Sequence, residues 1–351
     1  MVNVVITGGA GFLGSRLARE LLAAGSLEVA GGEARPLSRV TLVDQAPVPP
    51  DLAADERVTA VRGDLAQLLD PAAAGPDTLA IGGIGGIWGI WDEAEVIFHL
   101  AAAVSGECEA DFDLGIRANL RATEALLASC RALGTNPLVV FSSSLAVFGG
   151  SADHPLPAVV DDQTLPNPQT SYGAQKVVGE QLLADYTRKG FLRGRALRLV
   201  TISVRPGRPN GAASGFMSGI IREPLAGQRA TCPVAPDTEV ALASPAKAIA
   251  GLRSAATASD QAWGGRSAVN LPALTVSLAD MADALARIAG PQASALIDWI
   301  PDAEIARMVA SWPARVRADR AARLGLTPDP DFDSIIRMHL AESRSGASEG
   351  R

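Results

Sequence analysis

A glycine-rich turn near the start of the chain is the sequence feature that most restricts the possible folds. The apolar run Val2 to Thr7 is typical of a buried strand, and residues 15–24 have the spacing of a helix. Between them, glycines at positions 8, 11 and 14 form the pattern G-x-x-G-x-x-G. Glycines in this context allow a tight turn and let the start of a helix approach a pyrophosphate. The sequence therefore favours a dinucleotide-binding turn over an ordinary strand–helix connection.

The order of the later segments predicts an α/β fold. Predicted strands and helices alternate, with strands at 40–43, 58–61, 95–101, 138–141 and 197–204 and helices at 111–133 and 171–188. Alternation of this kind indicates a parallel sheet with helices on both faces. The predicted fold class is a Rossmann-type, doubly wound parallel sheet with a smaller C-terminal substrate-binding lobe.

An acidic residue after the second predicted strand indicates which dinucleotide is bound. Asp44 directly follows the run 40–43, where a carboxylate accepts hydrogen bonds from the ribose 2′-OH and repels a 2′-phosphate. This favours NAD over NADP. The distance in sequence from Gly14 to Asp44 is longer than the roughly 20 residues usual for this motif. The extra residues are assigned to a surface loop at 25–36. After the third strand, Asp64 and Leu65 are placed to meet the adenine.

The density of proline and glycine from Arg205 to Pro236 predicts a break in the regular alternation. We expect residues 1–204 to form the NAD-binding domain. Residues 205–351 would form mainly the substrate-binding lobe, although some of their strands and helices return to the first domain. Late helices are predicted at 279–289 and 303–324, and the polar tail after Glu342 is predicted to fray. The segment 79–91, rich in Ile and Gly, has no assigned role.

A tyrosine and a lysine four residues apart predict a proton-transfer device. Tyr172 and Lys176 lie in the predicted helix 171–188, where four residues make about one turn, so both side chains share a face. We expect the ammonium to lower the pKa of the phenol. The strand 138–141 runs into Ser142-Ser143-Ser144, whose hydroxyls can orient a substrate oxygen.

Composition and charge argue against several other classes of function. The formal net charge of −7 leaves no basic stripe for nucleic acid. No uninterrupted apolar stretch is long enough to span a bilayer, and no N-terminal signal peptide is expected. The three cysteines at 108, 130 and 232 lack metal or redox spacing, and the three histidines are scattered, so no metal site is expected. The cysteine spacing indicates a reducing, cytoplasmic environment.

In this order, the motifs resemble the extended short-chain dehydrogenase/reductase family, the NAD-dependent epimerase/dehydratase group. The match covers Val2 to about Gly207 and includes His99-Leu100-Ala101-Ala102 and Asn119. The resemblance implies that Ser144, Tyr172 and Lys176 are catalytic. The implied cofactor-binding residues are Gly8, Gly11, Phe12, Leu13, Asp44, Asp64, Leu65, Leu100, Ala101, Ala102, Asn119, Ser142, Tyr172 and Lys176. A homodimer paired through the helices that carry Asp111 and Tyr172 is also implied.

A narrower resemblance concerns the substrate. The runs 146–150, 168–176, 204–210 and 219–225 are similar to sugar-acid dehydrogenases of this family, the group that oxidises D-erythronate at C2 with NAD. The substrate implied is a small sugar acid, with Ser105, Ser144, Thr201, Arg205 and Arg222 as candidate contacts. Residues 239–241 read Glu-Val-Ala where that group has Arg-x-Trp. The segment 79–91 is a second place where this sequence differs from that group.

Three alternatives are weighed against this interpretation. A sugar-nucleotide 4,6-dehydratase needs an Asp-Glu pair after the catalytic hydroxyl, but Leu145 and Ala146 follow Ser144. A nucleoside-diphosphate-sugar epimerase stays open, although the arginine that would hold the diphosphate is missing near Glu239. A nucleotide-sensing regulator would be indicated by loss of Tyr172 or Lys176, and both are present. Fold alone does not decide between these functions.

Overall fold

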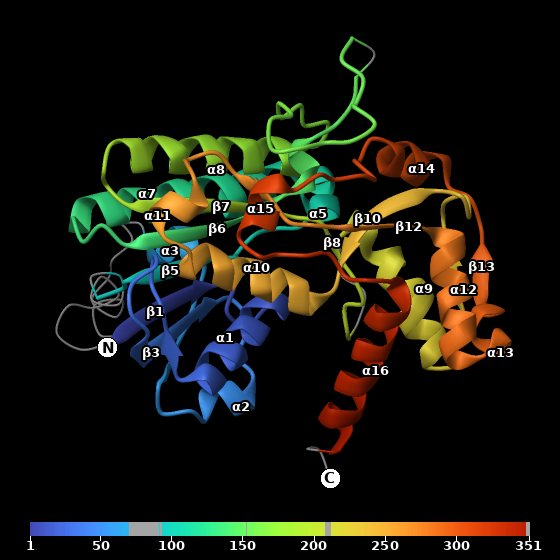
Figure 1. Ribbon diagram of the computed structural model, residues 1–351, viewed down its shortest axis with the longest axis horizontal. Helices are drawn as coiled ribbons and strands as arrows, with labels where there is room; N and C mark the ends of the chain where they lie inside the picture. Colours follow the sequence, from blue (N-terminus) through green and yellow to red (C-terminus); the bar gives the residue numbers. More distant parts are fainter. Residues whose placement is uncertain (70–90, 92, 152, 208–211, 349–351) are drawn as a thin grey trace. The chain divides into compact units, whose positions relative to one another are not determined.

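The computed structural model describes residues 1–69, 91, 93–151, 153–207 and 212–348 (Figure 1). They form two compact units that are interleaved along the chain. The first unit comprises Met1–Ser144, Thr170–Arg198 and Ile249–Val269, and the second comprises Leu145–Gln169, Leu199–Ala248 and Asn270–Arg351. The sequence places one boundary after residue 204, and its assignment of NAD binding and substrate binding to the two sides stays a prediction.

The first unit is built on a largely parallel sheet. Its strands are β1 (Val2–Thr7), β2 (Ser26–Leu27), β3 (Arg35–Asp44), β4 (Val58–Arg62), β5 (Val96–His99), β6 (Leu138–Ser144), β7 (Arg193–Leu199) and β11 (Val269–Asn270). The hydrogen-bonded order is β11-β7-β6-β5-β1-β3-β2, with β4 beside β3. Strand β1 pairs in parallel with both β3 and β5, so the chain winds outward in two directions from the first strand. This confirms the predicted fold class.

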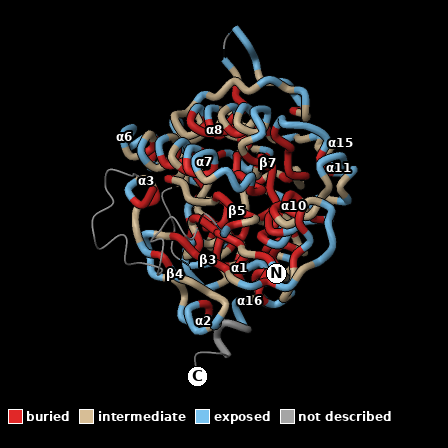
Figure 2. The backbone as a smooth tube through the Cα atoms, turned by 90° about the vertical axis from the view of Figure 1, so that its left-hand side faces the viewer, coloured by how far each residue is buried: buried red, intermediate tan, exposed pale blue. Residues whose placement is uncertain are grey.

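Helices cover both faces of this sheet, with α1 on one side and α7 and α8 on the other (Figure 1). The helices are α1 (Phe12–Ala24), α2 (Pro50–Ala53), α3 (Leu65–Leu68), α5 (Ser105–Ala110), α6 (Phe112–Gly115), α7 (Ala122–Leu133), α8 (Ser171–Arg188), α10 (Pro245–Thr257) and α11 (Asp260–Trp263). A π-helical turn, η2 (Ile116–Arg121), joins α6 to α7. Apolar residues of the strands, such as Ile97 and Val139, form one core with Leu126 of α7. Figure 2 shows that the backbone around β5 is mostly buried.

Two predictions within the first unit were wrong. The stretch 25–36 is not a plain surface loop, because β2 pairs antiparallel with the start of β3 and Leu27 is buried. The predicted strand 197–204 is two strands, since β7 ends at Leu199 and β8 (Thr201–Ile202) joins a different sheet. Apolar residues recur along the whole of 197–204, so the sequence does not reveal where the chain changes sheets.

The second unit has its own sheets and core. Its elements are η3 (Leu145–Val147), β8, η4 (Ala213–Gly215), α9 (Phe216–Leu225), β9 (Ala230–Cys232), β10 (Glu239–Ala243), β12 (Leu274–Ser277), α12 (Leu278–Ala289), α13 (Pro291–Ser294), β13 (Ile297–Trp299), α14 (Ala303–Ala310), α15 (Asp319–Arg323) and α16 (Phe332–Ser348). Strands β12, β10 and β8 form one sheet, and β13 pairs with β9. Buried residues of α9, α12 and α16, including Ile220, Leu285 and Ile336, share one core.

Two late predictions were also wrong. The expected helix 303–324 is divided into α14 and α15, and Pro313 lies between them. The tail after Glu342 continues as helix α16 to Ser348. Residues 79–90 and 208–210 of the motifs discussed above lie outside the described residues, whereas Trp91 is described and buried. Across the described part of the chain, no helix combines the length and the apolar character needed to cross a membrane.

Candidate active site

The glycine turn between β1 and α1 leaves no room for side chains. A Cβ on Gly14 would lie 2.0 Å from the Gly8 carbonyl oxygen, and Gly8 itself has a left-handed φ of +70°. The Gly8 amide donates to the Val43 carbonyl at 2.8 Å, which ties the turn to the end of β3. Helix α1 begins after Gly11 without a side-chain cap, so the positive end of its dipole lies at this turn. The predicted contacts Phe12 and Leu13 are its first residues.

Two predicted cofactor carboxylates lie at the ends of adjacent parallel strands. Asp44 ends β3 and accepts hydrogen bonds from the amides of Ala10 and Ala46, both at 3.0 Å. Asp64 follows β4 and caps α3 by accepting from the Ala66 amide at 2.9 Å. Because a carboxylate has about four acceptor positions, Asp44 retains capacity for ribose hydroxyls.

The segment after β5 lies against the end of β1. The Leu100 amide donates to the Thr7 carbonyl at 3.1 Å, and the Ala101 amide donates to Thr7 Oγ1 at 3.2 Å. Leu100, Ala101 and Ala102 are partly buried, and Leu65 is buried at the start of α3. The structure therefore brings these predicted cofactor contacts to the carboxyl ends of β1, β4 and β5, the edge at which doubly wound sheets bind ligands.

Lys176 is the buried cation of the site. Its Nζ donates to the Ser142 carbonyl at 2.8 Å and lies 4.8 Å from the centroid of the Phe141 ring. The centroid of the Tyr172 ring is 5.5 Å from the same atom. The side chain is 3% exposed, and this burial lowers the pKa of Lys176 from 10.5 to about 8. The Lys176 ammonium therefore loses its proton more easily than that of an exposed lysine. It lies beside the Tyr172 ring, as the sequence predicts.

The start of α8 is fixed by two caps that place Tyr172 in the first turn. Thr170 accepts a hydrogen bond from the Gly173 amide at 3.1 Å, and Glu109 accepts one from the Ser171 amide at 2.7 Å. Tyr172 is half-buried, and Ser144, the last residue of β6, has the same class of burial. Ser105 begins α5 and is also half-buried.

Asn119 lies in the π-helical turn and is buried among polar groups. Its Oδ1 accepts from the Ala103 amide at 2.8 Å, and its Nδ2 donates to the side-chain Oε1 of Gln175 at 2.8 Å. Gln175 directly precedes Lys176 on α8. Asn119 therefore bonds the segment after β5 to α8, the helix that carries the tyrosine and the lysine.

His99 connects strands β1 and β5 to α7. Its ring nitrogens lie 2.7 Å from Thr7 Oγ1 and 2.9 Å from Thr123 Oγ1. Complete burial, followed by the charge of Lys176, lowers the pKa of His99 to about 3. The ring is therefore neutral at physiological pH and bonded on both sides, as a structural histidine would be.

The candidate substrate residues Thr201, Arg205 and Arg222 belong to the second unit. Thr201 is paired with Leu242 in the sheet, and Arg222 on α9 donates to the Arg205 carbonyl at 2.8 Å and to the Glu223 carboxylate at 2.5 Å. Arg222 thus already forms an ion pair, and its side chain is 13% exposed. These contacts place Arg205 and Arg222 next to each other.

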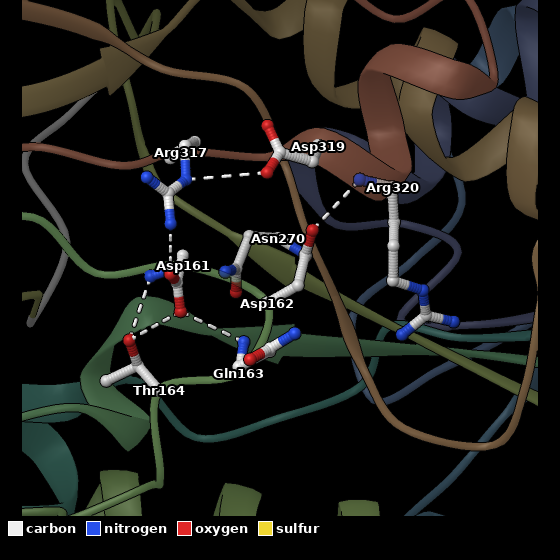
Figure 3. A network of polar contacts seen from close by, with 8 residues as sticks. All are labelled: Asp161, Asp162, Gln163, Thr164, Asn270, Arg317, Asp319 and Arg320. Carbon is white, nitrogen blue, oxygen red and sulfur yellow. Dashed lines mark hydrogen bonds and ion pairs between the residues drawn. The ribbon is translucent and has the colours of Figure 1, made fainter.

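Surface ion pairs occupy other positions of the second unit. Arg315 donates two hydrogen bonds to the Glu239 carboxylate, at 3.0 and 2.7 Å. An arginine from another segment therefore lies beside residue 239, where the sugar-acid dehydrogenases have an arginine of their own. Arg317 pairs with Asp161 at 2.5 Å in a network that joins the loop before α8 to the segment before α15 (Figure 3). Hydrogen bonds from the Gln163 amide and from neighbouring groups hold the pKa of Asp161 below its usual value.

Two further buried residues on α8 and β7, Glu180 and Arg198, were not predicted from the sequence. Glu180 accepts hydrogen bonds from Ser143 and Arg198, and all three side chains are buried. Glu180 lies four residues after Lys176, which is the signal that could have identified it. Among the described residues, no group of three or more His, Cys, Asp or Glu side chains has an arrangement that could hold a metal ion.

Comparison with known proteins places the chain in a family. Residues 90–241 match the model of the NAD dependent epimerase/dehydratase family. D-erythronate dehydrogenase from Cupriavidus necator is 49% identical over 346 residues, which cover 97% of this chain and 99% of the relative. D-erythronate dehydrogenase from Haemophilus influenzae is 37% identical over 340 residues, with coverage of 97% and 99%. The crystal structure of a nucleoside-diphosphate-sugar epimerase from Agrobacterium tumefaciens has a TM-score of 0.83 and 38% identity, and covers 98% of this chain and 95% of that one.

The chain belongs to the NAD-dependent epimerase/dehydratase family of extended short-chain dehydrogenases/reductases. It is an oxidoreductase, and its cofactor is NAD. The residues present fit this dinucleotide. The turn at Gly8 and Gly14 has no space for a Cβ, α1 begins there without a side-chain cap, and Asp44 stands at the end of the next strand of the sheet. This combination suits a pyrophosphate at the helix start and a ribose at the carboxylate.

Proposed function

We propose that this oxidoreductase oxidises the C2 hydroxyl of a small sugar acid, D-erythronate, to 2-dehydro-D-erythronate. Two relatives named D-erythronate dehydrogenase align with 97% of the chain, which supports this choice of substrate. The observation that carries the chemistry is the buried ammonium of Lys176, bonded to Ser142 at 2.8 Å one helical turn from Tyr172.

In the proposed mechanism, Tyr172 removes the proton of the C2 hydroxyl. A nearby ammonium favours the phenolate, which is the form of Tyr172 that accepts a proton. Ser144 at the end of β6 donates a hydrogen bond to the substrate oxygen and orients it as the carbonyl forms. The residues at the ends of β1, β3 and β4 would hold NAD, which would supply the hydride acceptor when bound.

A sugar acid also needs a partner for its carboxylate, because a buried, unpaired charge is costly. Arg205 and Arg222 are the candidates, and the hydrogen bond from Arg222 to the Arg205 carbonyl keeps them adjacent. Arg222 has five N–H donors, so it can bind a carboxylate while it also contacts Glu223. This assignment is supported by the resemblance of residues 219–225 to sugar-acid dehydrogenases.

The alternative is a nucleoside-diphosphate-sugar epimerase, which the name of the structural relative with a TM-score of 0.83 favours. One experiment separates the two functions. The purified chain is incubated with NAD and a panel of four- to six-carbon sugar acids and UDP-sugars, and NADH formation and sugar epimers are measured. We expect NADH from D-erythronate. Epimerised UDP-sugars without NADH from any sugar acid would replace the proposal with the alternative.

A homodimer and a cytoplasmic location are further parts of the proposal. Phe112 on α6 and Val178 on α8 are 60% and 41% exposed, and both lie near the helices through which the resemblance implies pairing. The three cysteines at 108, 130 and 232 are free and buried, as a reducing compartment would keep them. Sedimentation equilibrium tests the dimer, and a fluorescent fusion tests the location.

A further inference from the structure

A buried carboxylate lies one helical turn beyond Lys176 on α8. Glu180 is 4% exposed and accepts three hydrogen bonds. Ser143 Oγ donates at 2.5 Å, and Arg198 donates from Nε at 2.8 Å and from Nη2 at 2.7 Å. Ser143 belongs to β6 and Arg198 to β7, so one carboxylate bonds α8 to two strands of the sheet.

The same strand end carries the groups of the proposed mechanism. Ser143 lies between Ser142, whose carbonyl holds Lys176, and Ser144. Because side chains alternate along a strand, Ser143 points to the opposite face from its two neighbours. Helix α8 is therefore fastened to this strand end twice, through Lys176 and through Glu180. Bidentate, charge-assisted bonds such as those from Arg198 fix geometry more strictly than single neutral ones.

We propose that Glu180 is a positioning residue for the proton-transfer site. With Arg198 it fixes Ser143, and so the strand end that presents Ser142 and Ser144, and its charge favours the ammonium form of Lys176. This inference rests on the proposed function, in which Lys176 and Ser144 act on the substrate.

The electrostatic part follows from the groups that face Lys176. These are Cys108 from α5, His99 from β5, and Tyr172 and Glu180 from α8 itself. Burial raises the pKa of the Cys108 thiol and lowers the pKa of His99 to about 3, so both are neutral at pH 7. Glu180 is the carboxylate among these groups. Without its charge, the Arg198 guanidinium would stay buried without its counter-ion and would disfavour a second cation nearby.

A titration that does not depend on activity tests this part. The sequence contains three lysines, at 176, 189 and 247, so a sample labelled with ¹³C at lysine Cε gives one signal for each. Lys189→Arg and Lys247→Arg assign the signals by elimination. In Glu180→Gln we expect the titration midpoint of Lys176 to move to lower pH. A midpoint that stays in place or rises overturns the electrostatic role.

Two further variants separate positioning from loss of stability. The double variant Glu180→Gln with Arg198→Met removes both charges, and its Lys176 midpoint should return toward the wild-type value. If the single variant does not fold, Arg198→Met alone serves: it keeps the charge of Glu180 and removes the neighbouring cation, so the Lys176 midpoint should move to higher pH, and an unchanged midpoint overturns the electrostatic role. Asp260→Asn is the matched control, because Arg195 of the same strand β7 donates to Asp260 at 2.8 Å. This control should lower stability without moving the Lys176 midpoint. An equal movement in the control overturns the proposal.

Kinetics test the geometric part, with D-erythronate or whichever substrate the wild type proves to oxidise. Glu180→Gln and Ser143→Ala should each lower kcat by about tenfold while the KM for NAD is unchanged. Ser143→Ala removes one hydrogen bond and keeps both charges. Normal kcat in both variants overturns the geometric role. If the wild type oxidises nothing in the panel, the proposed function fails, whereas the lysine titration still decides whether Glu180 controls Lys176.

Discussion

Two sets of charged side chains, one in each compact unit, are stabilised in different ways. In the first unit, Lys176 and Glu180 are 3% and 4% exposed, and other buried groups satisfy them. In the second unit, Arg315 and Arg317 keep 56% and 61% of their side chains exposed and pair with acids at the surface. Buried charges demand fixed partners, whereas exposed pairs contribute little to stability.

This difference indicates which of these side chains tolerate substitution. Removing one partner of a buried pair leaves an uncompensated charge, so the groups around Lys176 are constrained together. The exposed ion pairs of Arg315 and Arg317 can be exchanged at small cost. Arg222 is intermediate, because its side chain is 13% exposed and paired with Glu223.

The most severe test of the comparison is Tyr172→Phe. The substitution keeps the ring and removes the hydroxyl, so folding and NAD binding should survive. Turnover should fall by roughly 10²–10⁴-fold, the effect of losing an acid/base group. Initial rates of NADH formation and a separate NAD-binding titration check both statements. Near-normal turnover would show that proton transfer does not depend on Tyr172.

The cost of burying Lys176 gives the next prediction. Below pH 8 the lysine is protonated in the folded and unfolded chains, and between about 8 and 10.5 only the unfolded chain keeps the proton. This group therefore adds stability as pH rises through that window. Lys176→Met removes this buried charge. The free energy of unfolding of the variant minus that of the wild type should therefore fall by about 3 kcal/mol from pH 7 to pH 10.5. Urea unfolding at several pH values measures this change, with substitution of the exposed Lys189 (Lys189→Met) as a control that shows no such trend.

The substrate side is tested by Arg222→Met. If this arginine holds the carboxylate, the KM for D-erythronate should rise by roughly 10- to 100-fold, because hydrogen bonds to a charged group are lost. The KM for NAD should not change. Glu223→Gln breaks the same ion pair but keeps the arginine, so it reports the purely structural effect. Arg205→Met is measured in the same way, and an unchanged KM in both arginine variants would remove them from the substrate site.

The smallest expected effect concerns cofactor choice. Asp44 should repel a 2′-phosphate, so kcat/KM should be higher with NAD than with NADP. Asp44→Ala should lower the ratio of these two kcat/KM values by about tenfold. The variant also loses the bonds to Ala10 and Ala46, so its thermal unfolding is recorded alongside. Equal use of NAD and NADP by the wild type would contradict the position assigned to the carboxylate.

Local sequence determined the parts of the protein that depend on short-range geometry. The glycine turn follows from the absence of Cβ atoms at positions 8 and 14, and α8 was predicted with its observed bounds, Ser171–Arg188. The one-turn spacing of Tyr172 and Lys176 is a property of any α-helix. The order of strands and helices was likewise sufficient for the doubly wound sheet.

Tertiary structure alone decided the features that depend on contacts between distant residues. Ser143 and Glu180 are 37 positions apart, and no local pattern reveals that they share a hydrogen bond. The division of residues 197–204 between two sheets and the pairing of Arg315 with Glu239 are of the same kind. The low pKa of Lys176 also belongs here, because it arises from burial by strands and helices remote in sequence. Sequence supplies the reacting groups, whereas packing sets their charge and their partners.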